Sequence, residues 1–200
     1  TGFTESREQA LLDGAYRFQT DARQNGRPVC SETWSFSGET LTVTSGGILA
    51  LGGNVGIKGG VVTASANNQL IIHTVGDLNL NAYISGGIQG FTKSSAGKLT
   101  LSNSSLVAGT TTISDGTLQL NAGSDTLRVV PTATVPTVFD LRVNGAGVLD
   151  LNGNSESVSN FSGNTTGVVD NTAAGTATFT VGEGNATAQS LFRQLSPGKN

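Results

Sequence analysis

The feature that most limits the possible folds of this chain is a short strand pattern that returns at a nearly constant spacing. The cores LNL, LTL and LQL begin at positions 78, 99 and 118, so the two steps between them are nearly equal. Each core alternates apolar and polar side chains, which is typical of a strand with one buried face. Strand-and-turn units with a period of about 20 residues predict a solenoid, in which each coil buries its apolar side chains against the next.

Similar alternating runs follow one another from about residue 33 onward, separated by Gly, Asn and Asp. The runs are TLTV at 40–43, ILAL at 48–51, QLII at 69–72, DLNL at 77–80, KLTL at 98–101, TLQL at 117–120, VLDL at 148–151 and TFTV at 178–181. We expect the Leu and Val side chains to point into the coil and the polar side chains between them to face water. Eight coils would form a rod on the order of 40 Å long.

A β-sandwich or Greek-key barrel is the alternative all-β architecture. Strands in those folds tend to recur every 8–12 residues or so, without the larger period seen here. No segment beyond residue 33 shows a convincing helical period of about 3.6 residues. The pattern therefore favours an all-β solenoid over residues 33–200.

Residues 1–32 differ in character from the rest of the chain. Residues 1–39 hold 10 of the 25 charged side chains, so charge is concentrated at the N-terminal end. A capping-box pattern at Ser6–Gln9 predicts one or two helical turns, and residues 15–19 predict a first strand. We therefore expect residues 1–32 to form a charged cap or linker ahead of the solenoid.

The composition disfavours several classes of protein. Only 12% of the residues are charged, against roughly 25% in ordinary globular domains, but the apolar 36% falls in regular blocks that disordered segments lack. No run approaches the roughly 20 apolar residues of a membrane-spanning helix. The net charge is −3 and the Lys and Arg side chains are dispersed, which disfavours a nucleic-acid partner. The single cysteine, Cys30, leaves no internal disulfide.

One stretch resembles a known family. Residues 90–120 read GFTKSSAGKLTLSNSSLVAGTTTISDGTLQL. The segments 90–93, 97–101, 109–112 and 116–120 resemble the successive elements of the autotransporter-associated β-strand repeat, also called the passenger-associated transport repeat. Ser95 stands where the family usually has Gly, and residues 104–106 read SSL where Asn-Thr-Tyr is common. Weaker similarity to repeat-rich surface proteins extends the resemblance over about 33–188.

The resemblance implies a right-handed parallel β-helix that forms part of an autotransporter passenger. Such passengers are exported through the outer membrane and end in a β-barrel translocator. The resemblance therefore implies a structural or adhesive rod, extracellular or on the bacterial cell surface, that meets the membrane only through its translocator. Its expected partners are a host or neighbouring cell surface, extracellular matrix or polysaccharide, and further copies of the same chain.

The main alternative is a carbohydrate-active β-helix enzyme that acts on extracellular polysaccharide. Glycoside hydrolysis needs two carboxylates about 5–9.5 Å apart. The scattered acids are Asp77, Asp115, Asp125, Asp140, Asp150, Glu156, Asp170 and Glu183. Most fit turn positions, and we expect Asp150 to face solvent between two leucines.

Other chemistry has little support in the sequence, and we expect no catalytic, cofactor or metal site. His73, the only histidine, lies in an apolar strand run, and Cys30 lies in a loop that contains a proline. The Gly-Gly pairs lack the Asp of calcium-binding rolls. The glycine-rich run at 52–56 is not followed by the Lys and helix of a phosphate-binding loop.

The densest group of aromatic residues lies near the N-terminal end. It consists of Tyr16, Phe18, Trp34 and Phe36. The terminal coil of a solenoid needs a cap over its open core, and we predict this role for the group, with a ligand-contact patch as the alternative.

Overall fold

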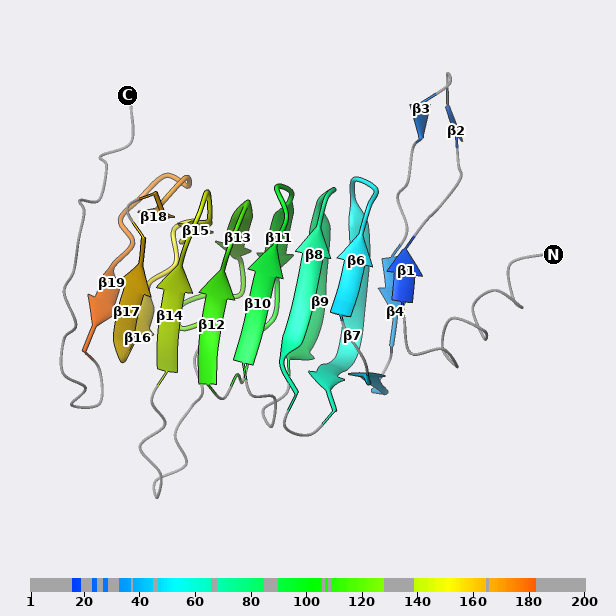
Figure 1. Cartoon of the computed structure of the whole chain (residues 1–200), viewed down its shortest axis with the longest axis horizontal. Coiled ribbons are helices and arrows are strands. Elements are labelled where there is room, and N and C mark those ends of the chain that lie inside the picture. The colour runs from blue at the N-terminus through cyan, green and yellow to red at the C-terminus, as the bar shows by residue number, and fades with distance from the viewer. Residues whose placement is uncertain are drawn as a thin grey trace.

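The computed structural model shows an all-β chain wound into a solenoid of about six turns, seen from the side in Figure 1. The structure describes residues 16–18, 23–24, 27–28 and 33–182, apart from 37, 45–46, 66–67, 85–89, 106, 108, 128–138 and 165. These described residues contain strands and turns and no helix. None of their elements is a helix long and apolar enough to cross a membrane.

Two parallel sheets form the long faces of the solenoid. The strands of the first sheet are, in spatial order, β1 (Tyr16–Phe18), β6 (Gly47–Ala50), β8 (Leu70–Thr74), β10 (Gly90–Ser94), β12 (Gly109–Ile113), β14 (Phe139–Val143) and β17 (Asn160–Gly163). Those of the second are β4 (Thr33–Ser35), β7 (Val55–Ala64), β9 (Leu78–Ile84), β11 (Lys98–Leu101), β13 (Thr117–Leu120), β15 (Val148–Asp150) and β18 (Val168–Asp170). Successive strands of each sheet come from successive coils.

Shorter elements complete the coils. β5 (Thr40–Val43) pairs with the second half of β7, and β16 (Glu156–Val158) pairs with β19 (Phe179–Val181), both in parallel. These pairs form a third side of the coils. A bridge between Ile84 and Ser105 and a hydrogen bond from the Ser105 N–H to the Thr126 carbonyl continue it. β2 (Arg23–Gln24) and β3 (Arg27–Pro28) form the one antiparallel pair of the described strands.

The register between coils stacks like side chains on like. In the second sheet Leu78, Leu99, Leu118 and Leu149 form one column, and each is at most 1% exposed. Inward and outward positions alternate along each strand, as in the burial pattern of β13, where Leu118 and Leu120 are buried and their neighbours half-buried. Stacked apolar columns of this kind supply the core that no single coil has.

The solenoid predicted from the period is confirmed, and so are the first strand near residues 15–19 and all eight alternating runs. A sandwich or barrel is excluded because the long sheets are parallel. The number of coils is lower than expected. The coil that joins Leu118 to its partner Leu149 spans 31 positions, against 21 between Leu78 and Leu99. The helical turns expected near Ser6 lie outside the described residues.

Candidate functional site

The turns between β8 and β9, between β10 and β11, and between β12 and β13 lie above one another at one corner of the solenoid. Each contains a glycine: Gly76, Gly97 and Gly116. A Cβ on Gly97 would lie 2.5 Å from the Gly76 carbonyl oxygen, and one on Gly116 would lie 2.5 Å from the Gly97 carbonyl oxygen. Gly116 also has a φ of +64°, which L side chains rarely adopt. Successive coils therefore approach so closely here that only glycine fits, and we call these three residues the glycine corner.

Lys93 binds this corner from inside the solenoid. Its neighbours in register are Ile72 and Ile113, so a lysine takes an inward position that is apolar in the coils on either side. The side chain is 0% exposed. Its Nζ donates hydrogen bonds to the carbonyl oxygens of Ser95 (2.5 Å), Asp115 (2.7 Å) and Ser94 (3.3 Å). Because Asp115 belongs to the next coil, one ammonium group joins two consecutive turns.

The charge of Lys93 is held in an unfavourable environment. Burial lowers the pKa of Lys93 to about 8, although the negative charges of Asp115 and Asp77 raise it. The three carbonyl groups satisfy the three donors of an ammonium group. Lys93 is thus a structural cation that stabilises the turns rather than a free nucleophile in a pocket.

Ser95 has a backbone conformation that favours glycine. Its φ is +67°, in the left-handed region that is unfavourable for a residue with a Cβ. Its carbonyl oxygen accepts the shortest of the Lys93 hydrogen bonds. The turn keeps its shape in spite of the serine.

The comparisons with known proteins agree with this geometry. Residues 91–120 match the family model of the passenger-associated-transport-repeat. The chain carries a passenger-associated transport repeat. No curated protein and no solved structure shows significant similarity to the chain.

The repeat spans two coils of the solenoid. It contains β11, β12 and β13 and nearly all of β10. Lys93, Gly97 and Gly116 all lie within it, so the matched segment contains the lysine and two of the three glycines of the corner.

A polar ladder runs along the outside of the second sheet and ends at Asp150. Thr100 donates to the side-chain oxygen of Gln119 at 3.3 Å, and Gln119 donates to Asp150 at 2.8 Å. Thr172 donates to the two Asp150 oxygens from its hydroxyl (2.6 Å) and its N–H (3.0 Å).

The expectation that Asp150 faces solvent is wrong. Its side chain points outward from the sheet but is only 2% exposed, because the chain after β18 folds back over it and bonds to it through Thr172. Burial by itself raises the pKa of Asp150, but the hydrogen bonds from Thr172, Gln119 and Asn152 outweigh it and hold that pKa below its ordinary value. Asp150 fixes a loop and is closed to a substrate.

A second ladder, which was not predicted from the sequence, follows the strands of the second sheet. The side chain of Asn121 donates to Ser102 at 3.4 Å, and that of Asn152 donates to Asn121 at 3.2 Å. The side-chain oxygen of Asn171 then accepts the Gly153 N–H at 2.6 Å. A signal was present for Ser102, Asn121 and Asn152, because each directly follows the second buried leucine of its alternating run.

Glu156 is the one carboxylate placed inside the solenoid among the described residues. It is 0% exposed, and its Oε2 accepts the Leu127 N–H at 3.2 Å while Oε1 has no hydrogen-bond partner. Burial raises the pKa of Glu156 to about 7; the Leu127 bond lowers it and the negative charge of Asp125 raises it. Glu156 and Asp125 thus interact electrostatically, but the solenoid encloses Glu156, so the two acids do not form a pair that is open to a substrate.

The remaining acids each have a structural partner. Asp77 accepts the Lys98 N–H at 2.9 Å, Asp115 accepts the Gly116 N–H at 2.8 Å, and Asp140 accepts the Asn160 amide at 2.6 Å. Asp170 accepts the N–H of the following Asn171 at 2.8 Å. Glu183 lies outside the described residues.

His73 lies on the outer face of the first sheet, where its Nδ1 is 2.6 Å from the Ser94 hydroxyl of the next strand. Among the described residues nothing bonds its other ring nitrogen, so the third, orienting group of a catalytic triad is missing. The geometry is that of an exposed cross-strand polar pair. Cys30 lies outside the described residues.

The aromatic group of the N-terminal region is brought to one end of the rod. Tyr16 and Phe18 belong to β1 and Trp34 belongs to β4, and these are the end strands of the two long sheets (Figure 1). Phe36 is partly buried and packs against the core. The side chains of the other three lie outside the part of the chain that the structure describes.

Proposed function

We propose that this chain is a non-catalytic structural rod segment of a large bacterial protein that is secreted or displayed at the cell surface. The observation that carries the proposal is the repeat at 91–120, which spans two coils and whose lysine and glycines lock those coils together. A solenoid of this kind grows by adding coils, so length is the property it supplies.

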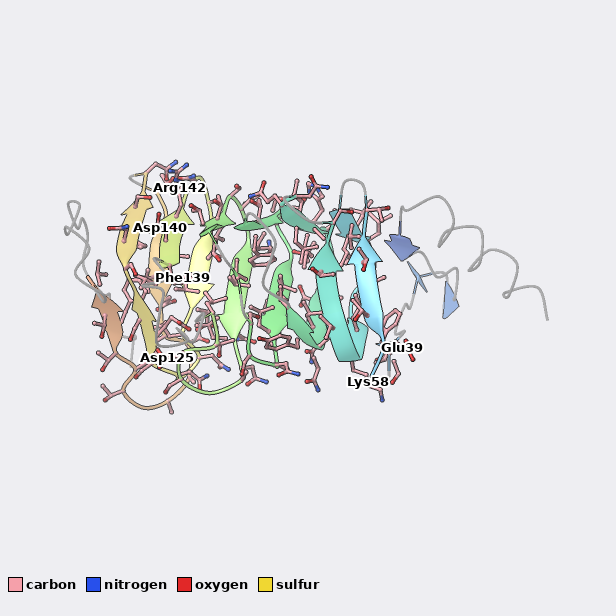
Figure 2. The ribbon with its side chains drawn as sticks, turned by 90° about the horizontal axis from the view of Figure 1, so that it is seen from below. Glu39, Lys58, Asp125, Phe139, Asp140 and Arg142 are labelled. Carbon is pink, nitrogen blue, oxygen red and sulfur yellow. The ribbon has the colours of Figure 1, made fainter. Side chains whose placement is uncertain are left out.

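The outer surface supports a rod-like role. The charged side chains labelled in Figure 2 are spread out, with Glu39 and Lys58 towards one end and Asp125, Asp140 and Arg142 towards the other. Between them the outward positions of the strands carry mainly Thr, Ser, Asn and Gln. The acids lie in turns, ladders or the interior, which supports a role without catalysis.

Display is the direct test of this proposal. The full chain, with an epitope tag in the exposed turn at Gly53, would be fused to an outer-membrane β-barrel translocator in a Gram-negative host. We expect the tag to be accessible to antibody on intact cells. A double variant, Lys93→Met with Gly116→Ala, provides the matched control in which the corner is damaged. The proposal would be contradicted if the tagged chain without these two substitutions stayed inside cells whose barrel had inserted.

A separate assay tests the non-catalytic part. The purified chain would be incubated with neutral and acidic polysaccharides, and the release of new reducing or unsaturated ends would be measured. We expect none. Release that disappears in the Asp140→Asn variant, whose carboxylate is partly exposed, would show an enzyme instead.

We further propose that Tyr16, Phe18, Trp34 and Phe36 cap the N-terminal end of the core. The placement of β1 and β4 as end strands and the packing of Phe36 support this role. Trp34 is the only tryptophan, so tryptophan fluorescence reports on this group alone. A cap predicts blue-shifted emission that acrylamide quenches weakly, whereas an exposed contact patch predicts red-shifted, strongly quenched emission.

Adhesion is proposed to occur through polar contacts on the second sheet. A shallow hollow of about 310 Å³ opens on the outer face, where Gly56 lies in register between Thr33 and Asn79. Asp77 and Lys98 also line it, so it offers both acceptors and a cation to a polysaccharide or matrix surface. Binding of the chain to arrayed polysaccharides, compared with that of Asn79→Ala, tests this contact. Sedimentation at increasing concentration tests self-association.

A further inference from the structure

Asn-Gly pairs are chemically labile, and the described residues contain two of them. In such a pair the backbone nitrogen of the glycine attacks the side-chain carbonyl carbon of the asparagine. A new C–N bond forms, the amide C–N bond breaks and ammonia leaves. Water then opens the cyclic imide to aspartate or isoaspartate. The reaction needs a mobile asparagine side chain and a free glycine N–H, so the fold decides which pair reacts.

The pair Asn152–Gly153 is held at both reacting groups. The Asn152 amide donates to the Leu120 carbonyl and to the Asn121 side chain, each at 3.2 Å. The Gly153 N–H donates to the Asn171 side chain at 2.6 Å. These three bonds hold Asn152 and Gly153 in the second ladder, the one formed by Ser102, Asn121, Asn152 and Asn171. The attacking nitrogen and the carbonyl carbon are therefore kept from meeting unless the ladder opens.

The pair Asn144–Gly145 forms the turn between β14 and β15 and is held only through its main chain. The Asn144 N–H donates to the Ile113 carbonyl at 2.8 Å, and its carbonyl accepts the Gly147 N–H at 2.9 Å. Within the described residues neither the Asn144 side-chain amide nor the Gly145 N–H has a hydrogen-bond partner. Both residues are partly exposed and Ala146 is exposed, so water reaches the turn.

The turn also requires its glycine. Gly145 has a φ of +57°, and a Cβ there would lie 2.5 Å from the Ser114 carbonyl oxygen. The close contact between coils thus requires a glycine at position 145, and this glycine makes Asn144 prone to conversion.

We propose that Asn144 is a site of spontaneous conversion to aspartate and isoaspartate in the folded protein, and that the ladder protects Asn152. The conversion adds one negative charge to the turn. The isoaspartate product also lengthens the main chain by one methylene group, which loosens the turn between β14 and β15.

The test is peptide mapping by mass spectrometry after incubation of the full folded chain at mildly alkaline pH. We expect conversion at Asn144 to be at least about tenfold faster than at Asn152, because three hydrogen bonds must open before Asn152 reacts. In the urea-denatured chain the two pairs should react at similar rates. The Asn171→Ala variant, which frees the Gly153 N–H, should speed conversion at Asn152 and leave the rate at Asn144 unchanged.

Two results would overturn the proposal. One is an Asn144 that stays intact in the folded chain while the denatured chain converts it. The other is equal conversion of Asn144 and Asn152 in the folded chain. Asn144→Gln serves as the matched variant, because it keeps the amide and should remove the part of the acidic species on isoelectric focusing that comes from this turn.

Discussion

Replacing Glu156 with glutamine should make the protein more stable above neutral pH. Glu156 is fully buried and burial raises its pKa to about 7 from an ordinary 4.5. The folded state therefore keeps a proton that the unfolded chain releases between pH 4.5 and 7. It follows that this group stabilises the fold fully below pH 4.5 and that its contribution is lost as pH rises through 7. At about 1.36 kcal/mol per pKa unit, the loss amounts to about 3 kcal/mol.

Urea unfolding of the wild type and of Glu156→Gln on both sides of this window measures the effect. As pH rises through this window, the free energy of unfolding of the wild type should fall by about 3 kcal/mol more than that of the variant. Glu39→Gln is the matched control, because it makes the same chemical change at an exposed position. If Glu156→Gln follows the wild-type curve, or is the less stable protein above neutral pH, the reasoning from burial is wrong.

Three further predictions concern the glycine corner with Lys93 and the ladder that ends at Asp150. Lys93→Met should lower the free energy of unfolding by about 2 kcal/mol or more, because the carbonyl groups of two coils lose their charged donor; an unchanged urea midpoint would contradict this. Ser95→Gly should raise it by about 1 kcal/mol by relieving a left-handed φ, whereas Gly116→Ala should lower it; equal effects of the two changes would refute the assigned geometry. Asp150→Asn should weaken the hydrogen bonds to Thr172. In the wild type, the stability that this carboxylate contributes should be lost as pH falls below its ordinary pKa of 3.8, and the variant should show no such loss. Urea unfolding of both proteins across that pH range measures the difference.

Much of the fold was predictable because the columns of leucine repeat along the chain. All eight alternating runs coincide with strands, and the step between successive Leu-X-Leu cores is the length of one coil. Three of the strands that escaped this pattern have an unusual inward residue or an interruption. β10 places Lys93 inward, β12 places Thr111 inward, and β7 is broken by the register shift between Lys58 and Val61. Polar inward residues hide a strand from a test based on apolar alternation.

The candidate site was less predictable because its parts meet only when coils stack. Gly97 and Gly116 were visible as part of a family pattern, but the reason for their spacing lies outside their local sequence. Their role depends on carbonyl groups that belong to the preceding coil. Asp150 shows the same limit, since the residue that covers it, Thr172, lies 22 positions away.

A period-2 pattern repeated about every 20 residues was enough to predict a stack of short strands, because such a pattern has one efficient way to bury its apolar side chains. The role of each polar residue, in contrast, became clear only from the folded chain. An aspartate between two leucines becomes a buried loop anchor, a lysine becomes an interior cation shared by two turns, and a glutamate becomes a group that titrates near neutrality. The physical reason is that burial and hydrogen bonding are set by the neighbouring coils, and their identity and distance are not written in the local sequence.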